Sequence, residues 1–287
     1  MNINDLHAFV SVSEHGSFSL AAEALYLTQP AVSKRIAALE QELDTRLFDR
    51  IGRTTTPTEA GRTLLIHAQR ILGEVEDSRR AIANLEHSVQ GQLKLATSHH
   101  IGLHRLPGVL KPFIQQYPDV QLNLSFMDSE QACRAVEQGE QELSLITLPP
   151  QRSTVLELID IWTDRLVLTV SPSHPLAREK RITPEVLTRH PAILPARGTY
   201  TRELIDQQLG LPSINTKLET HYLETIKMMV EVGMGWSLWP DNMLDDTLKP
   251  AQGGDIVVER KLGIVRHPQR TLSNAARAFI DICSRHA

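Results

Sequence analysis

The sequence predicts an all-α N-terminal domain, a long helix and a C-terminal α/β domain, and three observations lead to this fold class. Apolar residues recur at helical spacing in short segments near the N-terminus. A much longer segment then carries apolar residues at alternating spacings of four and three. Beyond it, short apolar runs alternate with helical segments, as in α/β proteins. The predicted domains are residues 1–57, 58–89 and 90–287.

Composition is that of an ordinary globular protein. The chain has 287 residues, of which 41% are hydrophobic and 22% are charged, enough for two or three domains. Apolar runs all fall short of the ~20 residues that span a bilayer, and the first ten residues lack the features of a secretion signal. We therefore expect a cytoplasmic protein without a membrane partner. Cys133 and Cys283 lie too far apart to indicate a disulfide framework or a zinc ribbon.

Charge is distributed unevenly along the chain. The formal net charge of −4 argues against a protein that coats nucleic acid non-specifically. Basic residues nevertheless gather in one short region, namely Lys34, Arg35, Arg46, Arg50 and Arg53. Local binding of nucleic acid is therefore compatible with the composition.

The N-terminal domain begins with two predicted helices. The first covers residues 3–15, with Leu6 and Phe9 on its core face, and Gly16 ends it. The second follows at once, because Ser17 or Ser19 can cap a helix whose apolar residues fall at helical spacing. A tight turn then leads to a third helix.

The third helix combines a buried stripe with an exposed polar face. Thr28 is placed to cap it, and Pro30 falls in the first turn, where its missing N–H costs nothing. Glutamine can read adenine, and arginine or lysine can read guanine or hold phosphate, so such a face suits a DNA major groove. An ordinary surface helix is the alternative. The inward stripe is Val32, Ile36, Leu39 and Leu43, and the exposed face carries Gln29, Ser33, Lys34 and Arg35.

These helices belong to a longer pattern that resembles the winged helix-turn-helix of LysR-type transcriptional regulators. The match extends in fixed register over about sixty residues, which is far more specific than a lone short motif. The matching residues are Phe9-Val10, Gly16-Ser17-Phe18, Ala21-Ala22, Leu25, Thr28-Gln29-Pro30-Ala31-Val32-Ser33, Ile36, Leu39-Glu40, Leu43, Leu47-Phe48-Asp49-Arg50 and Thr58-Glu59-Ala60-Gly61.

The resemblance implies which residues contact DNA. Gln29, Pro30 and Ser33 would touch base edges, and Lys34 and Arg35 would contact phosphates or groove walls. The loop 50–57 corresponds to the wing of the family, where Arg50 and Arg53 would reach the backbone and the minor groove. The wing departs from the family pattern in its three threonines and in Pro57, and Asp44 stands where glycine is common.

Residues 58–89 form one predicted linker helix, which Thr58 caps. Its apolar stripe is narrow and long, so a monomer would leave it exposed, and we expect a homodimer. Packing of the stripe on the chain's own C-terminal domain is the alternative. The family resemblance further implies a tetramer. The stripe consists of Leu64, Ala68, Ile71, Val75, Ser78, Ile82, Leu85 and Val89.

The C-terminal domain is predicted to contain two α/β lobes. Expected strands lie at 93–97, 120–126, 143–146, 156–161, 166–171, 192–194, 218–220, 236–239 and 261–266. Expected helices lie at 103–117, 129–138, 184–189, 200–209, 222–232 and 273–284. This layout resembles the effector domain of the same regulators, with two periplasmic-binding-protein-like lobes. Lobe 1 would be 90–160 with 268–287, and lobe 2 would be 161–267.

Polar residues at strand ends mark the expected effector site. Ligands of α/β sheets bind at the carboxyl ends of strands and near helix N-termini, and in the family the matching loops surround the inducer. Hydroxyls, imidazoles and arginines favour a small carboxylate as the effector. The candidate residues are Thr97, Ser98, His99, His100, Asp128, Thr147, Arg197, Thr199, Tyr200, His221, Tyr222 and Arg266.

Other sites and functions are weaker interpretations. His99, His100 and His104 could form a metal site, but no Cys, Asp or Glu at matching spacing completes it, so we predict neither a metal nor another cofactor. Cys133 lacks a nearby resolving cysteine for a redox switch. Catalytic motifs are absent from the sequence, so an enzyme is not expected, although a solute-binding protein or a two-lobed enzyme remains the alternative. The expected partners are double-stranded promoter DNA, the effector and RNA polymerase.

Overall fold

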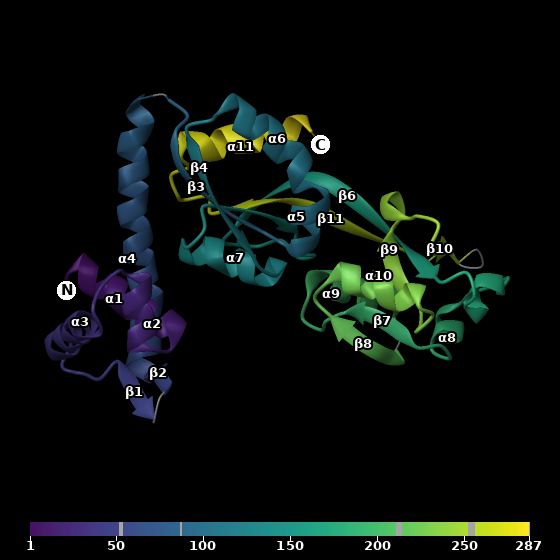
Figure 1. Cartoon of the computed structure of the whole chain (residues 1–287), viewed down its shortest axis with the longest axis horizontal. Coiled ribbons are helices and arrows are strands. Elements are labelled where there is room, and N and C mark those ends of the chain that lie inside the picture. The colour runs from purple at the N-terminus through teal and green to yellow at the C-terminus, as the bar shows by residue number, and fades with distance from the viewer. Residues whose placement is uncertain (52–53, 87, 211–213, 252–255, 287) are drawn as a thin grey trace. The chain divides into compact units, whose positions relative to one another are not determined.

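A computed structural model describes residues 1–51, 54–86, 88–210, 214–251 and 256–286 (Figure 1). The chain divides into two compact units. Unit 1 is residues 1–86 with 138–140, and unit 2 is residues 87–137 with 141–287. Among the described residues, none of the helices combines the length and apolar character that a membrane span requires.

Unit 1 contains the helix-turn-helix. Its helices are α1 (Ile3–His15), α2 (Phe18–Ala24) and α3 (Gln29–Glu42). Ser17 and Thr28 cap α2 and α3 as predicted, and Asn2 caps α1, each by accepting a hydrogen bond from the first turn of its helix. Gly16 follows α1 with a φ of 59°, a left-handed conformation that glycine adopts without strain.

The core of unit 1 joins the three helices to the wing. Val32, Ile36 and Leu39 are fully buried in it, and Phe48 packs against Phe9 with ring centroids 5.3 Å apart. Leu43 was expected in the same stripe, but its side chain is 39% exposed. It lies beyond the last residue of α3, just before Asp44 turns left-handed with a φ of 47°. That φ accounts for the glycine common at this position.

The wing is a short hairpin. Strand β1 (Phe48–Ile51) pairs antiparallel with β2 (Thr54–Pro57), so the segment expected as a loop is a two-stranded ribbon. Arg50 lies on β1, and its side chain is outside the described part of the structure, as is the whole of Arg53.

The long helix is shorter than the sequence predicts. Helix α4 (Glu59–Ala83) is followed by a 3₁₀ turn, Asn84–Glu86. Two residues of the apolar stripe, Leu64 and Ala68, pack in the core of unit 1. Ile82 is 69% exposed, and most of Leu85 is exposed as well. Val89 was expected to end the stripe, but it lies beyond the helix and packs against the core of unit 2.

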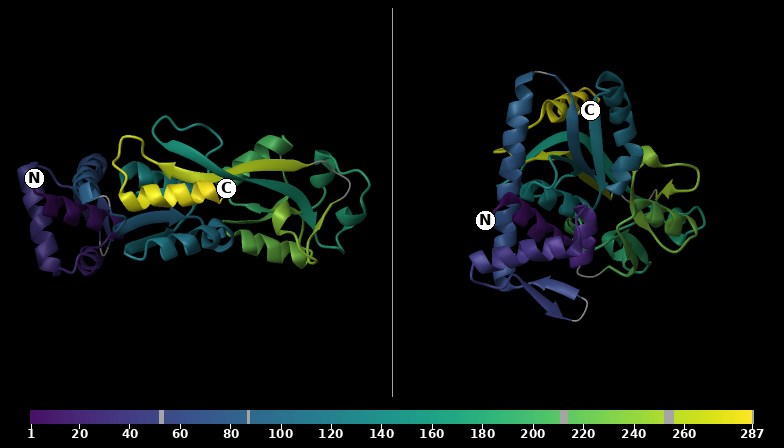
Figure 2. Two further views of the ribbon diagram at one scale, coloured as in Figure 1. Left: turned by 90° about the horizontal axis from the view of Figure 1, so that it is seen from above. Right: turned by 60° about the vertical axis from the view of Figure 1, so that its left-hand side comes forward.

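Unit 2 is built on one twisted sheet that passes through both lobes (Figures 1 and 2). Within the described residues its strand order is β10-β6-β11-β5-β3-β4, with β9 paired to β6. The strands are β3 (Gly91–Thr97), β4 (Val120–Phe126), β5 (Leu143–Thr147), β6 (Glu157–Val170), β9 (Ser237–Pro240), β10 (Lys249–Pro250) and β11 (Val257–Arg266).

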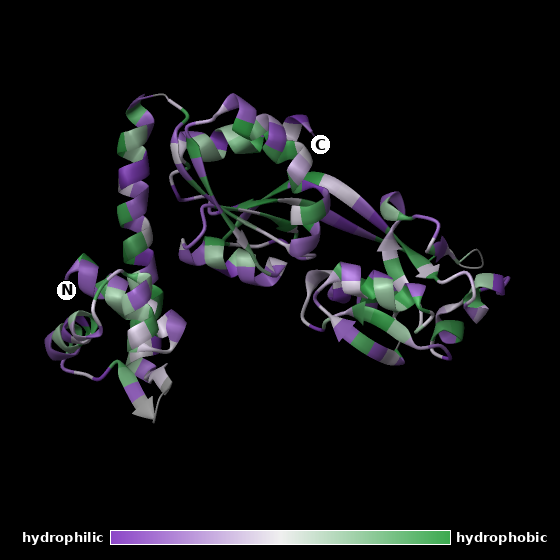
Figure 3. Cartoon of the chain, in the orientation of Figure 1, coloured by the Kyte–Doolittle hydropathy of each residue, from purple (hydrophilic) through white to green (hydrophobic). Residues whose placement is uncertain are grey.

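Lobe 1 is a sheet covered by helices on both faces. Strand β3 pairs in parallel with β4 and β5, as expected for βαβ units. Leu95 and Leu145 point to one face, whereas Ala96 and Ile146 point to the other. The apolar strands lie between these helices in Figure 3. The helices are α5 (His99–His104), α6 (Leu106–Gln116) and α11 (Asn274–Arg285) on the first face and α7 (Ser129–Gln138) on the second.

Lobe 2 packs helices on a smaller sheet. Strand β7 (Ala192–Pro195) pairs in parallel with β8 (Thr216–Thr220). Side chains of β7 alternate, so Leu194 packs with α9 (Tyr200–Leu209) and Ile193 packs with α10 (Leu223–Glu231). A short helix, α8 (Pro184–Leu187), closes one end of the core.

Two long strands connect the lobes. The sequence predicts separate strands at 156–161 and 166–171, but the structure has the single strand β6, which runs antiparallel to β11 over the length of β11. The polar residues Thr163, Asp164 and Arg165 that appeared to break the pattern lie within the ladder. The boundary between the lobes therefore falls inside continuous strands rather than in loops.

Candidate functional site

The exposed end of α3 is the first candidate site. Gln29 and Pro30 are exposed in its first turn, while the opposite face is buried in the core of unit 1. The amide Nε2 of Gln29 donates a hydrogen bond to Ser33 Oγ at 2.9 Å. An amide and a hydroxyl thus stand side by side on the solvent face, the combination that can bond to base edges.

The cationic residues of this region have different surroundings. Lys34 is exposed, so its ammonium is available to a phosphate. Arg35 is half-buried, and its Nη1 donates to the carbonyl of Asn4 at 3.3 Å. This contact ties α3 to the start of α1 and gives Arg35 a structural role beside any contact to DNA.

The second candidate site is a cavity of about 410 Å³ between the lobes of unit 2. This volume falls in the range of about 300–1,000 Å³ that is usual for small-molecule pockets. Eight of the residues expected from the sequence line it: Ser98, His99, His100, Asp128, Thr147, Thr199, His221 and Tyr222. Glu130, Thr201, Leu223 and Arg260 line it as well.

Helix N-termini converge on this cavity. Within the described residues, the cap or the first turn of α5, α7, α9 and α10 supplies residues that line it. Thr199 caps α9 by accepting from the N–H of Arg202, whereas α5 and α10 have no side-chain hydrogen bond at their caps. The cap residues of α5 and α10 therefore do not cover the first turns of these helices, and backbone N–H groups of such turns attract anionic ligands.

The acidic side chains of the cavity already have partners. His221 Nδ1 lies 2.9 Å from Asp128 Oδ2. Glu130 Oε1 accepts from the backbone N–H of Tyr200 at 2.5 Å. Each contact joins an element of lobe 1 to one of lobe 2. The negative charges of the wall are therefore engaged in holding the lobes together and are partly compensated.

Four residues expected in the effector site do not line the cavity. Thr97 is fully buried, and its hydroxyl donates to the carbonyl of Leu145 at 2.8 Å. The side chain of Arg197 is 73% exposed and lies 3.2 Å from Glu219. Arg266 pairs across the strands with Glu157 at 2.6 Å. The ring of Tyr200 packs against the apolar core behind α7.

A buried charge network lies behind the cavity. Asp164 is almost fully buried and accepts from Arg260 Nη2 at 2.9 Å and from Arg105 Nη2 at 2.7 Å. Burial raises the pKa of Asp164, but the facing imidazole of His100 and the guanidinium of Arg260 outweigh burial, so the net pKa is well below its usual range. Asp164 is therefore ionised, and Arg260 is held at the wall of the cavity.

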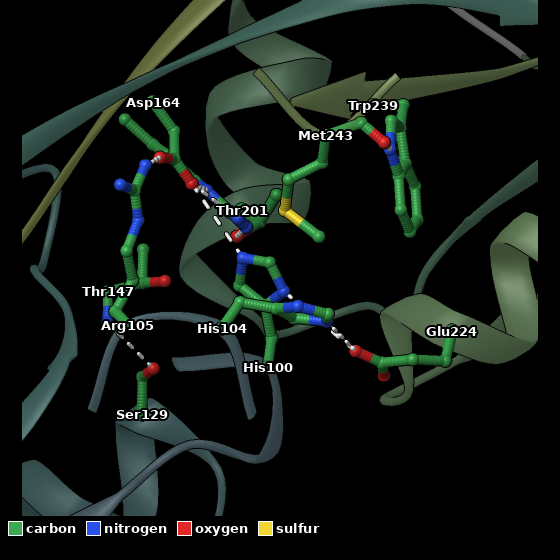
Figure 4. Close-up of polar contacts among 11 residues, drawn as sticks. His100, His104, Arg105, Ser129, Thr147, Asp164, Thr201, Glu224, Trp239 and Met243 are labelled. Carbon is green, nitrogen blue, oxygen red and sulfur yellow. Dashed lines mark hydrogen bonds and ion pairs between the residues drawn. The ribbon is translucent and has the colours of Figure 1, made fainter. Parts of the chain in front are cut away.

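Three side chains that could hold a metal ion also meet here. His104 Nε2 lies 3.1 Å from Glu224 Oε1, and His100 Nδ1 lies 3.9 Å from the same oxygen (Figure 4). His100 holds the pKa of Glu224 at about 2, against the opposing effect of burial. The fold thus supplies the carboxylate that the local sequence around the histidines lacks.

Sequence reasoning missed Arg260, Asp164 and Glu224. Arg260 and Asp164 lie on long strands in stretches of mixed charge that are typical of solvent-facing residues. Glu224 lies 120 residues from His104, and only the packing of α10 beside α5 brings the two together. The spacing of His100 and His104 on one helix was the only local signal of this cluster.

Both cysteines are buried core residues. Cys133 lies on α7 and faces the core of lobe 1, where burial raises the pKa of its thiol. Burial also raises the pKa of Cys283 to about 12. Thiols with raised pKa values are poor nucleophiles, which agrees with core packing rather than redox switching as the interpretation of Cys133.

Comparison with known proteins identifies both units. The family described as "Bacterial regulatory helix-turn-helix protein, lysR family" matches residues 3–62, and the LysR substrate binding domain matches residues 86–287. A probable RuBisCO transcriptional regulator of Trichormus variabilis is 32% identical over 291 residues, covering 96% of this chain and 86% of the relative.

Solved structures share the fold. A full-length variant of OxyR from Pseudomonas aeruginosa has a TM-score of 0.75 at 21% identity, covering 99% of this chain and 94% of that one. Full-length CbnR in complex with its target DNA has a TM-score of 0.66 at 20% identity, covering 100% of both chains. The arrangement of a helix-turn-helix with a two-lobed α/β domain is therefore that of full-length LysR regulators.

Proposed function

The chain belongs to the LysR-type family of DNA-binding transcriptional regulators, and from this premise we propose that a small carboxylate bound between its lobes controls its action at promoters. Membership of this family argues against the two alternative functions, a solute-binding protein and a two-lobed enzyme. We assign DNA binding to residues 1–57, dimerisation to 58–89 and effector binding to 90–287. A cytoplasmic location is part of the proposal, because a regulator of this kind acts on the chromosome.

The observation that carries the proposal is the polarity of the cavity wall. The uncapped N-termini of α5 and α10 present N–H groups, and hydroxyls and imidazoles add further donors. Asp128 and Glu130 are engaged by His221 and by the N–H of Tyr200, so they leave the imidazole of His99 and the N-termini of α5 and α10 to a ligand. His99, Phe126 and Tyr222 stand edge to face at the mouth, where they can cover an apolar part of a ligand.

For DNA binding we propose that α3 enters the major groove. Gln29, Pro30 and Ser33 would reach base edges, while Lys34, Arg35, Arg50 and Arg53 would contact phosphates or groove walls. A homodimer through α4 would present two such helices to a palindromic operator, and pairs of dimers would form the tetramer. Effector binding would favour one placement of the lobes, alter DNA bending through the assembly, and change contact with RNA polymerase.

The effector proposal is tested by the melting temperature of the full chain. We expect carboxylates from a panel of small acids to raise it with concentration, while the matched neutral amides leave it unchanged. His99→Ala should abolish the shift because His99 lines the cavity. Arg197→Ala is the control, since Arg197 lies outside the cavity and should keep it. Equal shifts with acids and amides would refute a carboxylate effector.

A further inference from the structure

His100 is a buried side chain whose hydrogen bonds are incomplete. Its side chain is only 9% exposed, and neither ring nitrogen has a hydrogen-bond partner among the described residues. Asp164 Oδ2 lies 3.7 Å from Nε2, and Glu224 Oε1 lies 3.9 Å from Nδ1, both beyond hydrogen-bonding distance. Glu224 Oε2 is also buried without such a partner. Buried polar atoms that lack a partner in the protein can be satisfied by an ion or by ordered water.

A second imidazole completes a compact set of donors. His104 follows His100 by one turn of α5, and the centroids of their rings lie 5.2 Å apart. One ligand atom from each of His100, His104 and Glu224 lies within 4.8 Å of the other two. Figure 4 shows the two rings and the carboxylate turned toward one another.

We propose that His100, His104 and Glu224 bind a divalent transition metal ion of the Zn²⁺ class. Zn²⁺ takes histidine nitrogens and carboxylate oxygens at about 2 Å, which puts neighbouring donors of a tetrahedral site about 3.3 Å apart. His104 Nε2 and Glu224 Oε1 are already 3.1 Å apart, so binding mainly requires this pair to approach His100 Nδ1, which lies 3.9 Å from Glu224 Oε1. The side chains of His104 and Glu224 are each more than a third exposed and can rotate to do so. A fourth position would remain for water or for an anionic ligand.

Asp164 has the place of an outer partner for this site. A histidine that binds metal through one nitrogen donates its other N–H to a carboxylate in many proteins. Here Glu224 faces Nδ1 of His100, and Asp164 faces Nε2 from the opposite side. Arg105 and Arg260 hold Asp164 and compensate its charge, so on metal binding Asp164 would accept the Nε2–H of His100 while Glu224 binds the ion.

The donor set selects among cations. Mg²⁺ and Ca²⁺ require oxygen ligands in larger number, whereas two imidazoles with one carboxylate suit Zn²⁺ and its neighbours in the transition series. Imidazole binds these ions through a ring nitrogen, a donor that a cluster of carboxylates lacks. Both features distinguish the site from a simple acidic patch.

A bound ion would connect the lobes. His100 and His104 belong to α5 of lobe 1, and Glu224 belongs to α10 of lobe 2. An ion held by both would fix the separation of these helices beside the effector cavity. Its influence on DNA binding rests on the proposed function, whereas the binding of the metal does not.

The site is tested by calorimetric titration of the full, tag-free chain with Zn²⁺ at neutral pH. We expect one ion per chain and no heat with Mg²⁺. His104→Ala and Glu224→Gln should each weaken Zn²⁺ binding at least tenfold. His67→Ala is the control, because His67 is an exposed histidine on α4 of unit 1 and should leave the affinity unchanged. Zn²⁺ should also raise the melting temperature of the wild type but not of the two site variants.

Several results would overturn the proposal. They are a lack of Zn²⁺ uptake by the wild type, wild-type affinity in both site variants, or an equal loss of affinity in His67→Ala. His104 is exposed, so His104→Ala decides the question even if Glu224→Gln fails to fold. Binding of DNA by the metal-free wild type, measured in parallel, separates failure of the metal site from failure of the proposed function.

Discussion

Gln29 donates its side-chain amide to the hydroxyl of Ser33 at 2.9 Å, across one turn of α3. An amide carries two N–H donors and one acceptor, so this bond uses only one of its donors. The remaining groups point away from a helix face that is otherwise fixed by Val32, Ile36 and Leu39 in the core. The pair therefore orients the amide before any DNA is bound, which favours direct contact with a base.

Lys34 provides a contrast, because an exposed ammonium next to this pair recognises charge rather than sequence. Lys34→Ala should weaken binding to all DNA sequences alike and reduce the slope of log affinity against log salt by about 1. Binding measured by fluorescence anisotropy over a salt series checks this. Lys217→Ala, an exposed lysine on β8, should change neither quantity. A loss confined to one DNA sequence would show that Lys34 reads a base.

Ile82 tests the dimer interface on α4. It lies on the predicted stripe and is 69% exposed, and burying such a side chain contributes about 1.5–3 kcal/mol. Ile82→Glu should therefore raise the dissociation constant of the dimer at least tenfold in sedimentation measurements. Ile66→Glu is the control, since Ile66 is also largely exposed but lies off the stripe. Equal weakening by both changes would place the interface elsewhere.

Gly61 marks a close contact between α4 and the segment before the wing. A Cβ at this position would lie 2.2 Å from the carbonyl oxygen of Leu47, so one of the two must move. Gly61→Ala should lower the free energy of unfolding of unit 1 by about 1–3 kcal/mol. Gly108→Ala, in α6 with open space around it, should instead stabilise by roughly 0.5–1 kcal/mol. Chemical denaturation measures both, and equal effects would refute the contact.

Asp164 should be the most sensitive carboxylate of unit 2. Asp164→Asn leaves the buried guanidinium of Arg260 without its counter-charge, a loss of about 3–5 kcal/mol in the free energy of unfolding. Asp160→Asn lies on the same strand but is exposed, and it should change that free energy by no more than about 0.5 kcal/mol. Similar losses of free energy of unfolding in the two variants would show that the buried charge network does not stabilise the fold.

Asp164 also determines how the free energy of unfolding changes with pH. The pKa of Asp164 is lowered in the folded chain, so its contribution is fully present above the unfolded value of about 3.9. This contribution to stability is lost as the pH falls from about 3.9 through the lower pKa of the folded chain. Glu224, with a folded pKa of about 2, acts in the same direction. The wild type should lose stability with acid more steeply than Asp164→Asn, and parallel curves would contradict this.

Local sequence predicts the helices of unit 1 closely because caps and apolar spacing specify them residue by residue. Thr28 caps α3, and Gly16 ends α1. The predicted burial of Leu43 was wrong, because the left-handed turn at Asp44 ends the helix before Leu43 can face the core. The continuity of β6 was also hidden, because its polar residues fall in a ladder that only the partner strand β11 reveals.

The cavity was predicted only in part, for a physical reason. Residues at strand ends, such as Ser98 and Asp128, reach it because parallel strands carry their loops to one edge. Arg197 and Arg266 lie near those loops but pair with acidic neighbours, Glu219 and Glu157, outside the cavity. Arg260 and Glu224 enter from elements whose approach depends on the packing of the lobes, which no local pattern encodes.

Whether α3 reads bases is decided by the affinity of the Gln29→Ala chain for DNA. The preferred fragment is first selected from genomic DNA with the wild type, and a scrambled fragment of equal length serves as reference. Gln29→Ala should lose about 1–3 kcal/mol on the preferred fragment and almost nothing on the scrambled one. Equal losses on both fragments, or no loss on either, would contradict base recognition by the exposed face of α3.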